Sequence, residues 1–290
     1  MTQLIDGKKI AFEVARKIAA TIEKMPGRKP GLAVLLVGEN PSSKIYIAMK
    51  KKKCEELGIL SFDEHLPFTI TEQKLIEKIE EFNEDPSIDG ILVQMPLPPH
   101  IDPHRIIQAI DPSKDVDGFH PMNMGNLLLG NPHCFCPCTP LGIHSLLIHS
   151  NIPISGKHVV IVGRSSIVGK PLAALLMQKA PDCNATVTIA HSMSENLQNI
   201  CKSADILIAA VGQAHFIKEN MIQEGACVID VGINRVETSS GRQQILGDVD
   251  FAHVAPKCSS ITPVPGGVGP MTIAMLMSNT LLSFERKPIK

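Results

Sequence analysis

Residues 158–171 read His-Val-Val-Ile-Val-Gly-Arg-Ser-Ser-Ile-Val-Gly-Lys-Pro, and an apolar segment follows them. The first five residues predict a buried strand. Pro171 suits the first turn of a helix, because its missing N–H would be unpaired there anyway. A strand, a glycine turn and a helix form the unit from which doubly wound parallel sheets are built, so this stretch predicts an α/β fold.

The rest of the chain alternates apolar runs of strand length with helical patterns. We expect buried strands at 31–37, 90–95, 158–162, 185–190, 205–211 and 226–231. Apolar residues three and four apart predict helices at 9–24, 43–57, 71–82, 139–149, 170–179 and 271–284. Strands that alternate with helices indicate parallel sheets covered by helices.

The length of the chain predicts two domains, because 290 residues exceed what one hydrophobic core usually serves. Residues 151–156 contain Pro153 and Gly156 and directly precede the strand at 158–162, so they mark the expected boundary. We expect a first domain of residues 1–150 and a second domain of residues 151–267.

The charge balance excludes a general electrostatic partnership with nucleic acid or an anionic membrane. The chain has 28 basic and 29 acidic residues, a formal net charge of -1. The first ten residues include Asp6, Lys8 and Lys9, so no secretory signal is expected. The apolar run at 31–38 is much shorter than the roughly 20 residues that span a bilayer. We therefore expect a soluble protein.

The eight cysteines are expected to be reduced, as in cytoplasmic proteins, because a chain of this length needs no disulfide framework. One cluster contains His133, Cys134, Cys136 and Cys138. Its spacing differs from the Cys-x2-Cys pairs of common zinc sites, and no second pair follows nearby. We expect no metal there.

The turn at 163–169 is a candidate cofactor loop. Glycine lets the backbone pass close to a pyrophosphate, whose charge the free amides of a helix N-terminus attract. The spacing Gly-x-Ser-x-x-x-Gly departs from the common Gly-x-Gly-x-x-Gly, so an ordinary strand-to-helix turn is the alternative. The next strand ends in His191-Ser192 instead of the acidic residue that binds the ribose of NAD. With Arg164 in the turn, the pattern favours NADP.

Polar side chains in the first domain form a second candidate site. Tyr46 and Lys50 are four residues apart and share one face of the expected helix. Gln94 lies at the carboxyl end of an expected strand, where parallel sheets bind ligands. Asp117 lies in the acidic loop at 114–119. A solvated lysine, a capping amide and a solvated turn would explain the same residues, so each is a candidate only.

A rigid stretch at 261–272 precedes the last expected helix. It reads Ile-Thr-Pro-Val-Pro-Gly-Gly-Val-Gly-Pro-Met-Thr, with three prolines and three glycines. Such a stretch holds the backbone in fixed conformations, as a ligand-contacting loop must, although a stiff connector is the alternative.

Taken together, these stretches resemble the bifunctional methylenetetrahydrofolate dehydrogenase/cyclohydrolase family along nearly the whole chain. The resemblance rests on residues 46–50, 90–98, 114–119, 137–140, 163–169, 231–234 and 262–272. It implies an N-terminal three-layer α/β catalytic domain and a Rossmann-like NADP-binding domain with a parallel sheet. It also implies that a C-terminal helix at 268–290 packs back on the first domain, and that the protein is a homodimer.

The resemblance further implies roles for individual residues. Lys50 would be catalytic, with Tyr46 and Gln94 beside it and Asp117 binding the pterin ring. The implied NADP contacts are Gly163, Arg164, Ser165, Ser192 and Ile233, and further substrate contacts are Pro265, Gly266 and Gly267.

The implied activity is NADP-dependent oxidation of 5,10-methylenetetrahydrofolate, followed by hydrolysis of the methenyl product to 10-formyltetrahydrofolate. Such a reaction belongs to the one-carbon metabolism that serves purine, methionine and histidine biosynthesis. One alternative is a dehydrogenase without the hydrolase activity, and another is a non-catalytic folate or nucleotide-binding module. A short-chain dehydrogenase is disfavoured, because there the Tyr-x-x-x-Lys pair follows the glycine loop, whereas here it precedes that loop.

Overall fold

The computed structural model describes residues 2–237, 241 and 243–286, and it divides the chain into two compact units. Unit 1 contains residues up to 12 and residues 139–272; unit 2 contains residues 13–138 and the chain from 273 onward. The units therefore divide at 138/139, whereas the sequence placed residues up to 150 in the first domain. Helix α6 (Cys138–His149) groups mostly with unit 1, where Thr139 Oγ1 lies 3.0 Å from Thr272 Oγ1.

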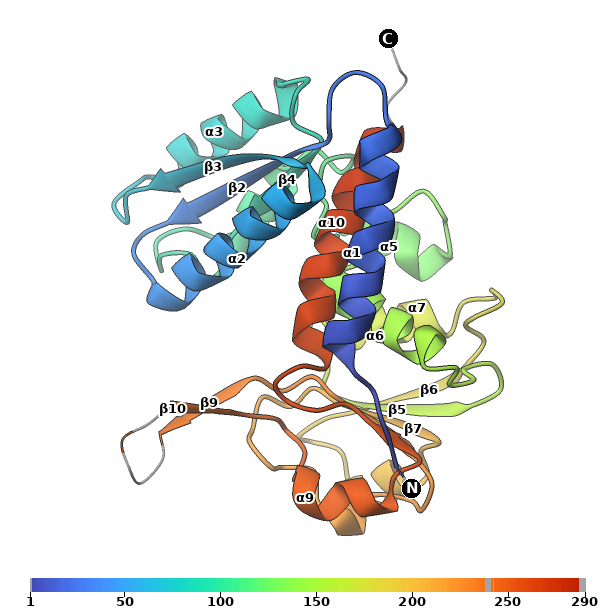
Figure 1. The fold of residues 1–290 in the computed structure, drawn as a ribbon. Helices are drawn as coiled ribbons and strands as arrows, with labels where there is room; N and C mark the ends of the chain where they lie inside the picture. Colours follow the sequence, from blue (N-terminus) through green and yellow to red (C-terminus); the bar gives the residue numbers. More distant parts are fainter. Residues whose placement is uncertain (1, 238–240, 242, 287–290) are drawn as a thin grey trace. The chain divides into compact units, whose positions relative to one another are not determined.

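Unit 1 is built on a six-stranded parallel sheet (Figure 1). Its strands are β1 (Gln3–Leu4), β5 (His158–Val162), β6 (Thr186–Ala190), β7 (Ile206–Ala209), β8 (Cys227–Asp230) and β11 (Ser260–Ile261). Their order is β1-β11-β8-β7-β5-β6, so the chain reverses its direction of travel across the sheet at β5. This is the point where doubly wound sheets bind ligands, and the loop after β5 is the one at 163–168.

The helices of unit 1 are short. They are α7 (Gly169–Leu176), α8 (Leu197–Lys202), α9 (Phe251–Val254) and the 3-10 turns η1 (Glu219–Met221) and η2 (Ala255–Lys257). A core that includes Val160, Leu207, Val228 and Val254 holds them against the sheet. An antiparallel hairpin of β9 (Asn234–Glu237) and β10 (Gln243–Leu246) follows β8.

Unit 2 contains a three-stranded parallel sheet in the order β3-β2-β4. The strands are β2 (Gly31–Val37), β3 (Leu60–Leu66) and β4 (Gly90–Val93). Helices α2 (Pro41–Leu57) and α3 (Glu72–Glu84) lie on opposite sides of this sheet, which makes three layers (Figure 1). The other helices are α1 (Gly7–Lys24), α4 (Pro103–Ala109), α5 (Pro121–Leu129) and α10 (Val268–Arg286), of which α1 and α10 begin in unit 1.

The C-terminal half of α10 is hydrogen-bonded to the loops of unit 2. Asn279 Nδ2 donates to the carbonyl of Val116 at 2.8 Å, and Ser283 Oγ donates to the carbonyl of Asp89 at 2.6 Å. Asn279 and Ser283 are buried, so these bonds satisfy polar groups that would otherwise be costly inside the protein.

The expected α/β class with parallel sheets is confirmed, and the six expected strands and six expected helices are all present. Their ends differ by a few residues; α7, for example, ends at Leu176 instead of residue 179. Strand β3 was missed because its sequence, Leu-Ser-Phe-Asp-Glu-His-Leu, is mostly polar and it forms an edge of its sheet. The hairpin β9–β10 was missed for a similar reason, since its side chains are largely exposed.

Within the residues that the structure describes, all eight cysteines are free thiols. No helix in the same part of the chain combines the length and the apolar character needed to cross a bilayer.

Candidate functional site

The structure brings Lys50 and Gln94 together in unit 2. Lys50 lies on α2, which begins where Asn40 Oδ1 accepts hydrogen bonds from the amides of Ser42 and Ser43. The Nζ atom of Lys50 donates to Oε1 of Gln94 at 2.9 Å. Gln94 directly follows β4, and its Nε2 donates to the carbonyl of Met95 at 2.8 Å. The amide is therefore oriented, with its oxygen presented to the lysine.

The loop that carries Asp117 is held beside the same strand. Asp115 forms a parallel bridge with Ile91 of β4, two residues before Asp117. The carboxylate of Asp115 accepts hydrogen bonds from the amide of His120 and from Nδ2 of Asn123, both at 2.8 Å. The next turn requires glycine at 118, where φ is 75° and a Cβ would lie 2.7 Å from the nitrogen of Pro137.

Burial shifts the pKa of both charged groups in this site. Removal from water lowers the pKa of Lys50 below its ordinary value, and the negative charge of Asp117 opposes that change. Removal from water likewise raises the pKa of Asp117, against the effect of the Lys50 ammonium. A lysine that loses its proton more readily than usual can act as a base.

Tyr46 lies one helical turn before Lys50 on α2 and is half-buried. The helical repeat places its side chain on the same side of α2 as Lys50. The structure thus brings Lys50 and Gln94 into direct contact, sets Asp117 close enough to act on the charge of Lys50, and leaves the role of Tyr46 a prediction.

The loop after β5 in unit 1 depends on its two glycines. Gly163 has a φ of 137°, and a Cβ there would lie 2.2 Å from the carbonyl oxygen of Ala210. A Cβ on Gly169 would lie 2.1 Å from the carbonyl oxygen of Gly163. The hydroxyl of Ser165 accepts a hydrogen bond from the amide of Val168 at 3.1 Å, while the side chain of Arg164 is exposed. The loop is therefore a tight backbone cradle with an available cation, which suits the phosphates of a dinucleotide.

The end of β6 lies next to β5 in the sheet and carries His191 and Ser192. The amide of His191 is bonded to Oγ of Ser194 at 2.9 Å, and the exposed Ser192 follows. Ile233, between β8 and β9, is 50% exposed, so its apolar side chain is available to a ligand. These placements fit the predicted contacts with a cofactor, which remain predictions.

The predicted substrate contacts at Pro265, Gly266 and Gly267 lie in unit 1, before α10. The carbonyl of Gly266 accepts a hydrogen bond from the amide of Lys8 at 3.1 Å. A Cβ on Gly267 would lie 2.7 Å from the carbonyl oxygen of Pro263, so this backbone is closely packed. Pro265 itself is exposed. The stretch is closely packed, and its contact with substrate stays a prediction.

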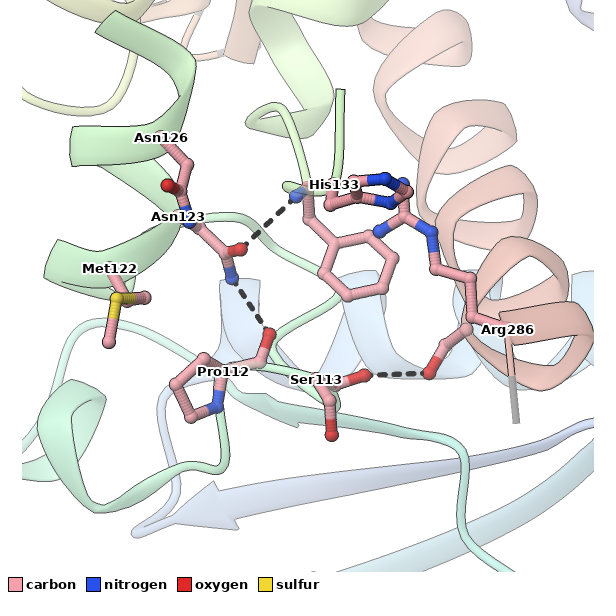
Figure 2. Close-up of a pocket in the computed structure, with 9 residues that line it drawn as sticks. Pro112, Ser113, Met122, Asn123, Asn126, His133 and Arg286 are labelled. Atoms are coloured by element: carbon pink, nitrogen blue, oxygen red, sulfur yellow. Dashed lines mark hydrogen bonds between the residues drawn. The ribbon is translucent and has the colours of Figure 1, made fainter. Parts of the chain in front are cut away.

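A cavity of about 440 Å³ lies in unit 2 beside Pro112 and Ser113 (Figure 2). Its lining residues are Pro112, Ser113, Met122, Asn123, Asn126, His133, Phe135, Ser283 and Arg286, and none of the predicted site residues is among them. Arg286 stacks over the ring of Phe135 at 4.9 Å and donates to the carbonyl of Pro132 at 3.0 Å. Asn123 connects this wall to the carboxylate of Asp115.

Four buried acids were not among the residues expected from the sequence: Asp89, Asp115, Asp230 and Asp248. Asp115 lies in the acidic loop at 114–119, but Asp117 was the residue of that loop predicted to bind substrate. The signal for Asp248 was the sequence Gly-Asp-Val-Asp at 247–250, whose glycine and acid together indicate a close backbone approach. Among the described residues, no three His, Cys, Asp or Glu side chains are grouped so that they could hold a metal ion.

Comparison with known proteins covers nearly the whole chain. Residues 5–117 match the catalytic domain of tetrahydrofolate dehydrogenase/cyclohydrolase, and residues 137–288 match the NAD(P)-binding domain of the same family. The bifunctional protein FolD of Protochlamydia amoebophila is 55% identical over 285 residues, which cover 98% of each chain.

Solved structures agree. The bifunctional FolD dehydrogenase/cyclohydrolase of Campylobacter jejuni is 46% identical, with a TM-score of 0.94 over 98% of this chain and 99% of that chain. The Trypanosoma brucei enzyme, solved with NADP cofactor and an inhibitor, is 35% identical, with a TM-score of 0.91 over 98% of each chain. The resemblance seen in the sequence is confirmed, and the chain belongs to the tetrahydrofolate dehydrogenase/cyclohydrolase family.

Proposed function

We propose that this protein oxidises 5,10-methylenetetrahydrofolate with NADP and hydrolyses the 5,10-methenyl product to 10-formyltetrahydrofolate. The observation that carries the proposal is the desolvated Lys50, hydrogen-bonded to Gln94 and influenced by the charge of Asp117. Family membership supplies the substrate class.

The oxidation needs positioning more than a base. The methylene carbon lies between two nitrogens whose lone pairs drive the loss of a hydride, and NADP accepts that hydride. The cradle of Gly163 and Gly169 fits the phosphates of this cofactor, since a Cβ at either glycine would collide with backbone. Arg164, Ser165 and Ser192 would bind the nucleotide half, and Ile233 would contact the nicotinamide half.

The hydrolysis needs proton transfer. Water adds to the methenyl carbon and loses one proton to the neutral amine of Lys50. The hydroxyl of the adduct then gives up its proton as the formyl C=O forms, while the bond from this carbon to N5 breaks and N5 takes up that proton. Gln94 holds the Lys50 side chain in place. Asp117 would bind the pterin ring through paired hydrogen bonds, with Tyr46 and the stretch Pro265–Gly267 as further contacts.

Unit 2 would accordingly supply Lys50, Gln94 and Asp117 to the folate, and unit 1 would bind NADP. We also propose a homodimer with no nucleic-acid partner and a cytoplasmic location. The support for a second copy is that β6 forms an edge of the parallel sheet with Ile189 partly exposed, since unpaired edges invite further pairing. Light scattering after size exclusion tests this: a mass near 31.4 kDa would contradict the dimer.

The test of the function is a spectroscopic assay. The purified protein is given 5,10-methylenetetrahydrofolate with NADP or NAD, and formation and decay of the methenyl compound are followed by absorbance. Formation with NADP followed by decay supports both activities. Accumulation without decay would indicate a dehydrogenase alone, and binding of both ligands without turnover would indicate a binding module.

A further inference from the structure

Two acids lie buried where the strands of unit 1 end. Asp230 is the last residue of β8 and is 3% exposed, and Asp248, which follows β10, is 0% exposed. Within the residues that the structure describes, neither acid is ion-paired with a lysine, arginine or histidine. Buried carboxylates without a cation are costly unless several donors bind them, so the partners of these two acids are informative.

Asp248 binds two segments at once. Its Oδ2 accepts hydrogen bonds from the amides of Val211 at 2.6 Å and Gly212 at 2.9 Å, which follow β7. Its Oδ1 accepts a hydrogen bond of 2.8 Å from Nδ2 of Asn234. One side chain therefore connects the turn after β7 to the start of the β9–β10 hairpin.

Asp230 completes the arrangement with three backbone amides. Its Oδ1 accepts from Gly232 and from Asp248, both at 2.9 Å, and its Oδ2 accepts from Val249 at 3.0 Å. Asp230 thus holds Asp248 in place and also turns the chain immediately after β8.

Two glycines make room for the carboxylates. A Cβ on Gly232 would lie 2.3 Å from Oδ1 of Asp248, and a Cβ on Gly247 would lie 1.9 Å from Oδ2 of Asp230. A side chain at either position would displace one of the two acids from its hydrogen-bond donors. The sequences Val-Gly-Ile-Asn at 231–234 and Gly-Asp-Val-Asp at 247–250 are therefore two halves of one arrangement.

Ile233 lies between two residues that the acids bind. Its neighbours Gly232 and Asn234 are hydrogen-bonded to Asp230 and Asp248, while its own side chain is 50% exposed. The turn at Val211 and Gly212 follows Ala210, whose carbonyl packs against Gly163 of the cofactor loop. The two acids thus hold in place the two segments beside that loop, which are residues 232–234 and the turn at 211–212.

We propose that Asp230 and Asp248 are positioning residues of the cofactor site, which hold Ile233 and the turn at 211–212 in the geometry that binds NADP. The inference rests on the proposed contact of Ile233 with the nicotinamide half. A carboxylate is needed because it presents only acceptors, whereas an amide would direct an N–H group at one of the donors. Substitution of either acid by asparagine should therefore loosen one of the two held segments and leave the strands in place.

The experiment compares Asp248→Asn with the unaltered protein in two assays. The dehydrogenase assay gives the KM for NADP, and a second assay gives the rate of hydrolysis of added 5,10-methenyltetrahydrofolate, which requires no NADP. We expect the KM to rise about tenfold, the effect of losing one buried charge-assisted hydrogen bond. Hydrolysis should keep its rate because the residues proposed to transfer its proton, Lys50 and Gln94, lie in unit 2.

The matched control is Asp205→Asn. The carboxylate of Asp205 accepts a hydrogen bond of 2.9 Å from the amide of His158. This bond lies where β5 and β7 begin, whereas Asp230 lies at the carboxyl end of β8. This variant should change thermal stability without changing the KM for NADP. An equal rise in KM for both variants would show a merely structural effect and overturn the proposal.

A second variant keeps the proposal testable if Asp248→Asn does not fold. Asn234→Ala removes the donor to Oδ1 of Asp248, together with a longer bond of 3.3 Å to the carbonyl of Leu246, and leaves both carboxylates in place. It should raise the KM for NADP with hydrolysis intact, and a KM equal to that of the unaltered protein would refute the positioning role. Absence of NADP-dependent oxidation in the unaltered protein would instead refute the proposed function.

Discussion

The ammonium of Lys50 donates a hydrogen bond of 2.9 Å to the amide oxygen of Gln94, and this bond joins α2 to the residue that follows β4. An amide neutralises no charge, so it orients the lysine without stabilising its protonated form as strongly as a carboxylate would. Lys50 is thus held in place while its pKa remains lowered by burial.

Lys50→Met should separate the two reactions. Hydrolysis of the methenyl compound should fall by about a hundredfold or more, the usual effect of removing a general base, while oxidation keeps an appreciable rate. The measurement is accumulation of the methenyl compound during turnover with NADP. Lys52→Met is the control, because Lys52 is exposed on the same helix. Hydrolysis at the original rate in folded Lys50→Met would remove Lys50 from the mechanism.

Asp117→Asn should weaken folate binding and shift the pH dependence of hydrolysis. A carboxylate accepts paired hydrogen bonds from the pterin, whereas an amide cannot accept both. The charge of Asp117 raises the pKa of Lys50, so its removal lowers that pKa and moves the alkaline rise of kcat for hydrolysis to lower pH. Titration with a folate ligand and a pH–rate profile check this. An unmoved profile with unchanged affinity would indicate a solvated loop, and NADP binding should be unaffected.

Arg164→Ala should weaken NADP far more than NAD. The exposed guanidinium lies in the cofactor loop, and the neighbouring strand β6 is followed by His191 and Ser192 instead of an acid. Loss of a charge-assisted contact to the ribose phosphate corresponds to about a thirtyfold rise in the KM for NADP. Lys179→Ala removes an exposed cation beyond the far end of α7 and serves as the control. Equal catalytic efficiency of the unaltered protein with NADP and NAD would contradict the assignment.

The buried carboxyl of Asp115 should make the folded state less stable as the pH rises. Burial raises its pKa to about 7 from an ordinary value of 3.8, so the folded protein binds this proton more tightly than the unfolded chain. The corresponding stability is fully present below pH 3.8 and is lost as the pH rises through about 7.

Urea unfolding between pH 4 and 7 tests this against Asp115→Asn, which has no proton to lose. The free energy of unfolding of the unaltered protein, relative to the variant, should fall by about 1.4 kcal/mol per pH unit in this range. Parallel curves for the two proteins would show that Asp115 titrates normally.

The strands of the two sheets show which elements a sequence can reveal. The limits of β2 and β5 agree with those expected, because both are continuous apolar runs buried on both faces. Strand β3 carries Asp63, Glu64 and His65 and pairs on one side only, so its pairing depends on β2 rather than on its own composition.

The sequence by itself determined the α/β class, the family and the face shared by Tyr46 and Lys50, because periodicity and motif spacing are local properties of the chain. Only the tertiary structure decided that Gln94 pairs with Lys50, 44 residues earlier, and that Asp230 and Asp248 share one buried network. An acid in a sequence looks the same whether it is solvated or buried. Its burial depends on donors that converge only when the parallel sheet has formed. They are backbone amides after β7 and β8 and the side-chain amide of Asn234 in the β9–β10 hairpin.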